Sequence, residues 1–431
     1  MGSKINNIWT KLVGTSQSER CRGLEIGPDG SIYIGGFTEG DLDGQKNNGG
    51  TSDLFISKFD SNGVKQWTKL IGNTDNEEGG FLTIGSDGSI YIGGTTNPSG
   101  PGNQGTFICK LNSNGDQQWL HHFGLSEYEE GNGLTIDSDD SIYLTGYTYG
   151  NIDNQLNSGK TDAFIRKINP DGSLIWTRLI GSSEEEQGNR STVDSDGSIY
   201  FTGYSYGNLD GQTNSGGTDA FLTKLNSNGD KVWTQFLGTN DDEFGFGLTT
   251  GQDGSIYLTG STRGELEGEI YNGGEDAFLT KFNPDGTKAW TTTLGSITDD
   301  VGLEIRINAE GSIYLCGYTE GNLDNQTHSG GIGDLFISKF DSSGNKQWTQ
   351  LLGAVNAYNV ELSLSTDGKI YIAGNTSGNL NGQSNNGNSD AFIASFSEVN
   401  DSKGLTINGT ELNDTLSGTS TNDTINGLEG N

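Results

Sequence analysis

Seven tryptophans divide the chain into a tandem repeat. Their separations fall between 52 and 58 residues, and they occupy these positions: Trp9, Trp67, Trp119, Trp176, Trp233, Trp290 and Trp348. Spacing this regular indicates one repeated supersecondary unit rather than two or three unrelated domains, despite a length of 431 residues. Each unit must therefore bury its apolar face against its neighbours.

One repeat contains four extended segments. In the unit that begins at Trp176 they lie at 176–181, 191–193, 198–204 and 219–225, separated by an acidic loop, a long polar loop and two tight Gly turns. Enrichment in β-branched and aromatic residues is typical of strands, and Gly supplies the positive φ that tight turns need. Four antiparallel strands make one blade of a β-propeller.

The two ends of the array predict how the ring closes. The last unit runs through 390–396 without reaching a tryptophan strand, whereas the chain begins with an orphan tryptophan strand at 5–12. The N-terminal strand is expected to complete the final blade, which removes an exposed sheet edge. The predicted fold is all-β: a seven-bladed propeller of four-stranded antiparallel blades over 5–398, followed by the start of a parallel β-roll over 399–431.

The core of each repeat resembles a known bacterial repeat. Asp29-Gly-Ser-Ile-Tyr-Ile-Gly-Gly-Phe-Thr38 and Asp253-Gly-Ser-Ile-Tyr-Leu-Thr-Gly-Ser-Thr262 follow the pattern of the SBBP β-propeller repeat, and the resemblance covers residues 5 to about 398. It implies the fold and leaves the function open, because propellers host many activities.

After Val399 the period becomes nine residues. Gly, Asp and an aliphatic residue recur as Gly409, Asp414, Leu416 and again nine residues later. The pattern resembles the RTX calcium-binding β-roll, which implies Ca²⁺ held by carboxylate and turn-carbonyl oxygens. The implied metal-site residues are Gly409, Asn413, Asp414, Gly418, Asn422, Asp423 and Gly427. Thr410 and Thr419 depart from the family's second glycine, and a flexible Gly/Asn/Thr-rich linker is the alternative interpretation.

The nonapeptide array stops in mid-repeat at Asn431. RTX rolls share an ion between turns two repeats apart, so the resemblance implies at most one partial site. We interpret the sequence as a fragment or a truncated reading frame. The resemblance also implies type I export through a signal beyond Asn431, because the segment from Met1 to Ile5 lacks the apolar core of a signal peptide. An extracellular or cell-surface protein is expected.

The formal net charge of −33 argues against nucleic acid as a partner, because phosphate contacts need clustered Lys and Arg. No stretch is long and apolar enough for a membrane helix. The three cysteines occupy non-equivalent positions and suggest no disulfide framework. A monomer is expected.

Acidic residues recur in two kinds of loop. The loops after the tryptophan strands carry one column: Glu19, Glu77, Glu129, Glu186, Glu243, Asp300 and, in the seventh blade, Tyr358. A ring of carboxylates around a channel would hold a cation. Alternatively each carboxylate anchors its own loop on backbone N–H groups, and this interpretation is favoured because functional residues usually break a propeller's symmetry.

The long polar loops carry a second set, with members at Asp41/Asp43/Asp53, Asn151/Asp153/Asp162, Asn208/Asp210/Asp219, Glu265/Glu267/Asp276, Asn322/Asp324/Asp334 and Asn379/Asn381/Asp390. Calcium loops and hydrogen-bonded Asx staples both fit this pattern, and stapling is favoured. The second blade replaces the loop by the Pro/Gly-rich segment 97–103.

The symmetry breaks most sharply in blades 1, 6 and 7, which are neighbours in a closed ring. The unusual residues are Arg20, Arg22 and Glu25, then Glu304 and Arg306, then Tyr358, Asn359 and Glu361, with Arg190 added by blade 4. Converging Arg and carboxylate groups would bind a polar ligand or form inter-blade ion pairs that lock the ring.

The leading functional hypothesis is a non-enzymatic, calcium-associated module that binds a protein or glycan on the face that carries the long polar loops. The expected ligand contacts include Glu25, Arg190, Asn359 and Glu361. The domain order also resembles cyanobacterial alkylating enzymes that join alkyl halides to phenols or carboxylates. That resemblance implies a small-molecule substrate, a cytoplasmic location, and catalytic candidates Arg20, Arg22, Glu304, Arg306 and Tyr358.

Overall fold

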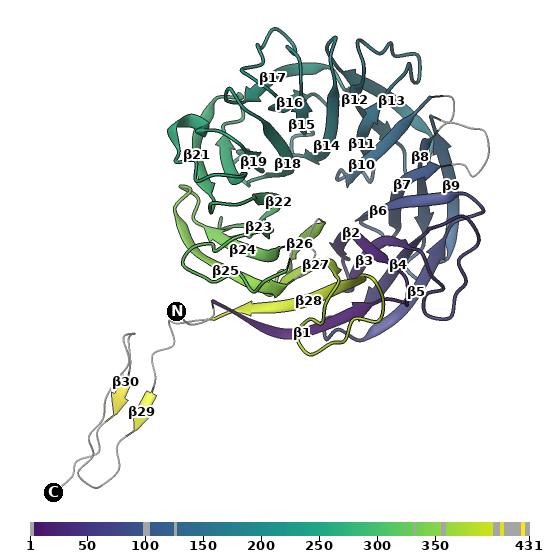
Figure 1. Ribbon diagram of the computed structural model, residues 1–431. Helices are drawn as coiled ribbons and strands as arrows, with labels where there is room; N and C mark the ends of the chain where they lie inside the picture. Colours follow the sequence, from purple (N-terminus) through teal and green to yellow (C-terminus); the bar gives the residue numbers. More distant parts are fainter. Residues whose placement is uncertain are drawn as a thin grey trace, which may run out of the picture.

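A computed structural model describes residues 4–97, 104–124, 127–331, 333–354, 359–399, 406–408 and 424–426. Within these residues each repeat forms one four-stranded antiparallel sheet, and seven such sheets surround a common axis (Figure 1). The predicted seven-bladed propeller is therefore confirmed. No helix in this part of the chain is long and apolar enough to cross a membrane.

Apart from β1, which is the outermost strand of blade 7, the strands of each blade follow in chain order from the axis outward. Blades 1 to 3 contain β2 (Glu19–Ile26), β3 (Ile32–Thr38), β4 (Asp53–Phe59), β5 (Lys65–Ile71); β6 (Asn76–Ile84), β7 (Ile90–Asn97), β8 (Gly105–Leu111), β9 (Gln117–Phe123); β10 (Glu129–Ile136), β11 (Ile142–Thr148), β12 (Asp162–Ile168), β13 (Leu174–Ile180). Blades 4 and 5 contain β14 (Glu186–Val193), β15 (Ile199–Ser205), β16 (Asp219–Leu225), β17 (Lys231–Leu237); β18 (Glu243–Thr250), β19 (Ile256–Thr262), the short 3₁₀ helix η1 (Leu266–Gly268), β20 (Asp276–Phe282), β21 (Lys288–Leu294). Blades 6 and 7 contain β22 (Asp300–Ile307), β23 (Ile313–Thr319), β24 (Asp334–Phe340), β25 (Lys346–Ala354); β26 (Val360–Leu364), β27 (Ile370–Thr376), β28 (Asp390–Glu398) and β1 (Ile5–Val13).

The ring closes as predicted. β1 pairs antiparallel with β28, from Ile5 opposite Glu398 to Val13 opposite Ala391, and supplies the outermost strand of blade 7 (Figure 1). The Val399 N–H continues the ladder by donating to the Lys4 carbonyl over 2.8 Å. The last blade is thereby built from both ends of the propeller.

The inner strands begin earlier than the sequence pattern predicts. β14 starts at Glu186, inside the segment interpreted as an acidic loop, and its pairing with β15 shifts register between Gly188 and Ser191. Such a bulge inserts extra residues into one strand and breaks the period-two alternation that marks a strand in sequence.

The apolar core lies between the blades. Each core cluster among the described residues joins two neighbours; one combines Leu222 of blade 4 with Leu258 and Phe278 of blade 5. The tryptophans stand at these joints. A Cβ on Gly229, whose φ is +79°, would lie 2.9 Å from the Trp176 ring of the preceding blade, so the turn must carry Gly. This contact explains the regular tryptophan spacing.

Beyond the propeller the structure describes two short strands, β29 (Thr406–Asn408) and β30 (Thr424–Asn426). They pair in parallel, with Thr406 opposite Thr424. The tail residues proposed to bind calcium lie outside the described residues: Gly409, Asn413, Asp414, Gly418, Asn422, Asp423 and Gly427. Tyr358 also lies outside them.

Candidate functional site

The first strand of every blade lies nearest the centre of the ring (Figure 1), and residues from all seven of these strands line a central channel: β2, β6, β10, β14, β18, β22 and β26. Each of these strands starts on the face that carries the long polar loops and ends on the face that carries the tight Gly turns. The first face is called the long-loop face and the second the tight-turn face. Functional side chains on the inner strands therefore fall at defined depths along the channel.

The repeated acidic column anchors loops. Its six described members, Glu19, Glu77, Glu129, Glu186, Glu243 and Asp300, are at most 2% exposed. Glu186 is typical: it accepts the Ser182 N–H and the Ser182 and Ser205 hydroxyls, each over 2.6 Å. These contacts agree with the favoured interpretation. The alternative, a ring of carboxylates facing the channel, is wrong because the inner strands bury these side chains within the blades.

Five of these carboxylates face an aspartate of the preceding blade. The pairs are Asp390–Glu19, Asp53–Glu77, Asp162–Glu186, Asp219–Glu243 and Asp276–Asp300. Each of the five aspartates that ends a long polar loop leaves its Oδ1 without a partner in the described part of the chain. Burial, followed by the neighbouring carboxylate, raises the pKa of Glu77 to about 7. Burial likewise raises the pKa of Asp300 to about 6.

Between blades 2 and 3 this carboxylate pair is replaced by a buried ion pair. Gly105 stands where other blades have the aspartate, and Arg166 enters the space. Its Nη1 and Nη2 lie 2.5 and 2.8 Å from the Glu129 carboxylate, and its Nε lies 2.7 Å from Asp153. Sequence reasoning missed this group. The available signal was an Arg where other blades have Ser57, Thr223, Thr280 and Ser338.

In blades 1, 4 and 6 the first two positions of the long loop act as staples. In blade 4 the Asn208 Oδ1 accepts the Asn214 N–H over 2.9 Å, while Asp210 pairs with Lys231 and accepts the Thr234 hydroxyl over 2.6 Å. The same contacts recur in blades 1 and 6. These contacts support the stapling interpretation over calcium loops.

Charged residues from four blades meet inside the channel. Arg190 of blade 4 pairs with Glu361 of blade 7, and its Nη2 lies 3.6 Å from Glu304 Oε2 of blade 6. Arg306 pairs with Glu304, and its Nη2 lies 3.9 Å from Glu25 Oε1 of blade 1. The predicted convergence is thus observed, with Arg190 reaching across the channel. We call Arg190, Glu304 and Glu361 the crossbar.

The crossbar divides the channel. Arg190 and Glu361 line both a cavity of about 230 Å³ toward the long-loop face and one of about 300 Å³ toward the tight-turn face. Burial raises the pKa of Glu361 to about 7, although Arg190 opposes the shift. The pKa of Glu361 rises because an ionised carboxylate loses hydration when it is buried inside the channel.

The other predicted site residues lie on the long-loop side of the crossbar. Arg22 and Asn359 line the smaller cavity. Arg22 also lies 5.9 Å from the centre of the Phe37 ring and 6.0 Å from that of Phe81, and Arg20 is exposed beside Phe37. The catalytic candidates Arg20 and Arg22 are therefore separated by the crossbar from Arg306.

Sequence reasoning also missed a band of aromatic rings at the mouth on the long-loop face, here called the aromatic crescent. Its members are Tyr128, Tyr147, Tyr149, Tyr204, Tyr206, Phe244 and Phe246. Tyr128 and Tyr149 meet edge to face at 4.9 Å between ring centres, and Tyr204 meets Phe244 at 5.0 Å. The available signal was Tyr149 in blade 3 and Tyr206 in blade 4, where other blades have Glu39, Arg263 or Glu320.

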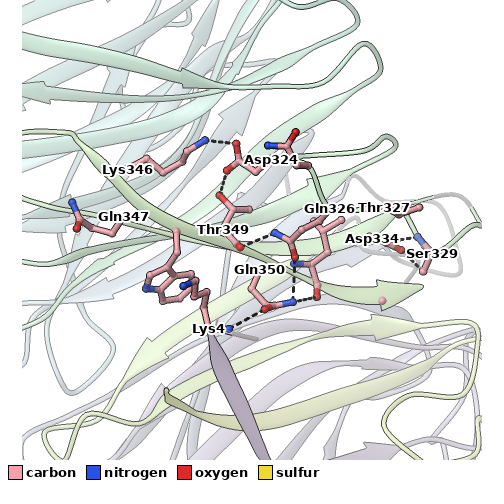
Figure 2. A pocket seen from close by; sticks show the side chains of 14 residues that line it. Lys4, Asp324, Gln326, Thr327, Ser329, Asp334, Lys346, Gln347, Thr349 and Gln350 are labelled. Carbon is pink, nitrogen blue, oxygen red and sulfur yellow. Dashed lines mark hydrogen bonds and ion pairs between the residues drawn. The ribbon is translucent and has the colours of Figure 1, made fainter. Parts of the chain in front are cut away.

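A cavity of about 780 Å³ lies between blade 6 and the start of β1 (Figure 2). Its polar side chains bond one another: Thr349 donates to Asp324, and Gln326 donates to the Thr349 carbonyl over 2.6 Å. Gln350 Oε1 accepts the Lys4 N–H over 3.1 Å (Figure 2). Because the Asp324 staple repeats in other blades, this cavity is interpreted as the seam of ring closure rather than as the functional site.

Comparisons with known families support the propeller. Residues 118–153 match the SBBP family, described as a beta-propeller repeat. Residues 85–117 match the family described as Domain of unknown function (DUF5122) beta-propeller. Both matches fall inside the ring and agree with the resemblance found in the repeat core.

Two curated proteins align with most of the chain. The Regulatory protein FlaEY of Caulobacter vibrioides is 26% identical over 413 residues, covering 82% of this chain and 42% of its own length. An uncharacterized WD repeat-containing protein of Acanthamoeba polyphaga mimivirus is 22% identical over 500 residues, covering 85% of this chain and 36% of its own length. The chain spans less than half the length of these relatives.

Two solved structures share the fold at low identity. The polysaccharide lyase Uly1 superposes with a TM-score of 0.51 at 10% identity, covering 92% of this chain and 100% of its own. The Neurospora crassa Pan2 WD40 domain superposes with a TM-score of 0.50 at 11% identity, covering 91% and 96%. These likenesses show the fold alone.

Proposed function

We propose that the propeller is a binding scaffold that holds a basic segment of a partner protein against the aromatic crescent. The observation that carries the proposal is the exposure of three crescent tyrosines. Tyr128, Tyr149 and Tyr206 are 38%, 56% and 48% exposed, although each touches another ring. Clustered exposed Tyr side chains are typical of interfaces, because they offer large contact area at little cost in side-chain entropy.

The charge around the crescent favours a basic partner. Glu78, Glu127 and Glu130 lie beside Tyr128 or its neighbouring strand, and Glu184 and Glu185 precede blade 4's inner strand. The whole chain carries a formal net charge of −33. Lys and Arg side chains bind aromatic faces through cation–π attraction and bind carboxylates through ion pairs. A negative surface potential also speeds the association of a basic partner.

A basic peptide with a photocrosslinking group tests the proposal. Nona-lysine should crosslink to the crescent, and the double variant Tyr149→Ser/Tyr206→Ser should bind it about tenfold more weakly, the loss expected for interface aromatics. Val64→Ser/Val232→Ser is the matched control, because these side chains are 56% and 55% exposed and lie away from the crescent. Equal affinity of both double variants would mean diffuse charge attraction and would refute the proposal.

We further propose that the segment after Val399 begins a calcium-binding roll of a secreted or surface protein. The parallel pairing of β29 with β30 supports this idea, since the two strands are spaced by two nonapeptides. Calcium should raise the unfolding midpoint of the full chain relative to EDTA, and Asp414→Ala/Asp423→Ala should abolish the rise. An undiminished rise in that variant would place the ion elsewhere.

A further inference from the structure

The cavity of about 300 Å³ between the crossbar and the tight-turn face, here called the lower chamber, has a ring of hydroxyl groups. Thr83, Thr135, Thr192 and Thr249 line it, one from each of four consecutive blades. Each stands opposite the tyrosine of the next strand, so they share one depth in the channel. Within the described part of the chain, no protein group bonds these four hydroxyls, which leaves them available to a ligand.

Two charged residues replace threonine in this ring. Glu25 of β2 stands opposite Tyr33, and Arg306 of β22 stands opposite Tyr314, which is the register of the four threonines. Both residues line the lower chamber together with Glu304 and Glu361. Glu25 and Arg306 therefore add charged groups at the depth of the channel where four other blades present threonine hydroxyls.

The lower chamber holds more carboxyl groups than guanidinium groups. Arg190 and Arg306 face three carboxylates: Glu25, Glu304 and Glu361. Arg306 bonds Glu304 directly, and Arg190 bonds Glu361 directly. Arg306, at 3.9 Å, is the positive group nearest to Glu25, whose carboxylate also accepts a backbone hydrogen bond from Ile26 and keeps 33% of its side chain exposed. One carboxylate therefore lacks a close positive partner in a confined polar space.

We propose that the lower chamber binds a small hydroxylated ammonium compound. The ammonium group of the ligand pairs with the Glu25 carboxylate and gives it a close positive partner. The hydroxyl groups of the ligand form hydrogen bonds with the ring of threonines. The half-buried Ile26, Ile84 and Ile136 line the same chamber and contact the carbon skeleton. The volume is at the lower end of the range for small-molecule pockets. The crossbar separates this site from the aromatic crescent, so the two proposals stand independently.

D-Glucosamine and D-glucose provide a matched pair of probes, because they share hydroxyl groups and differ in the ammonium. Glucosamine should raise the unfolding midpoint of the full chain, and titration calorimetry should give one site per chain. Glucose at the same concentration should leave the midpoint unchanged. No response to glucosamine, or an equal response to glucose, would overturn the proposal.

Three variants locate the response. Glu25→Gln should weaken glucosamine binding at least about tenfold, because it removes the charged acceptor. Thr135→Val should weaken it several-fold while retaining the charge. Glu39→Gln, an exposed carboxylate on the long-loop face, should bind as the natural chain does. If Glu25→Gln and Thr135→Val both bind like Glu39→Gln, or if potassium ions produce the glucosamine shift, the assignment is wrong.

Discussion

Replacing Glu77 by Gln should stabilise the ring above neutral pH, whereas the same change at Glu129 should destabilise it. Both residues begin an inner strand and are at most 2% exposed. They differ in their partners. Glu77 faces the buried Asp53, and Glu77 Oε1 and Asp53 Oδ1 both lack a partner in the described structure. Glu129 instead forms two hydrogen bonds to Arg166.

The size of the effect at Glu77 follows from its pKa, which burial and then Asp53 raise from 4.5 to about 7. Because the folded-state pKa lies above the unfolded value, the folded protein holds more protons than the unfolded chain between about pH 4.5 and pH 7. This contribution is complete below pH 4.5 and is lost as the pH rises through 7. At about 1.4 kcal/mol per unit, the loss amounts to about 3 kcal/mol as an upper value.

Glutamine cannot ionise, and its amide can donate to Asp53 Oδ1. At pH 8 the Glu77→Gln variant should therefore be more stable than the natural chain by about 1–3 kcal/mol, with little difference at pH 4.5. Glu129→Gln leaves the fully buried Arg166 with Asp153 as its remaining carboxylate, which costs about 3–5 kcal/mol. The two isosteric substitutions are thus expected to change the free energy of unfolding in opposite directions at pH 8.

Urea unfolding monitored by tryptophan fluorescence at pH 5 and pH 8 measures both effects. Parallel samples with EDTA and with calcium serve as controls, since a cation between Asp53 and Glu77 would keep both carboxylates ionised. The reasoning fails if Glu77→Gln loses as much stability at pH 8 as Glu129→Gln does.

Three further outcomes can be checked separately. Gly229→Ala should lower the free energy of unfolding by about 1–3 kcal/mol more than Gly211→Ala does, as measured by thermal unfolding. Both glycines have a φ of +79°, but only at Gly229 would the new Cβ contact Trp176. Equal losses of stability in the two variants would contradict this reasoning. Arg190→Met should lower stability by about 3 kcal/mol at pH 8 and by less at pH 5, where Glu361, with a pKa of about 7, takes up a proton; a pH-independent loss would speak against the crossbar. Burial raises the pKa of the Cys21 and Cys109 thiols to about 12, so a thiol reagent at pH 8 should label them only after unfolding, and rapid labelling of the native chain would contradict their burial.

The fold was largely predictable because its signals are local and repeated. The tryptophan spacing, the Gly turns and the Asp-Gly-Ser-Ile-Tyr core each recur, so errors in one repeat are corrected by the others. Ring closure was also predictable, because an orphan strand at one end matches a missing strand at the other. Strand starts were predicted late, since the bulge after Gly188 breaks the alternation that identifies β14.

The candidate site was predicted only in part. Arg and Glu residues of blades 1, 6 and 7 were expected to converge because those blades are neighbours in the ring. Arg190 lies on blade 4, and only its reach across the channel to Glu361 assigns it to the crossbar. The aromatic crescent was missed because its rings come from different positions of the repeat and from three blades: Tyr149 and Tyr206 share one position, whereas Tyr128 and Phe244 come from others.

The amino-acid sequence by itself determined the repeat, the four strands of each blade and the closure by β1, because these depend on residue type at fixed spacing. The tertiary structure decided which charges meet. Glu77 and Glu129 occupy the same position in the repeat, yet Glu77 faces Asp53, whereas Glu129 faces Arg166 of β12, the third strand of its blade. Whether a buried carboxylate holds a proton or an ion pair depends on the side chain that fills the space beside it, and that neighbour comes from a distant part of the chain.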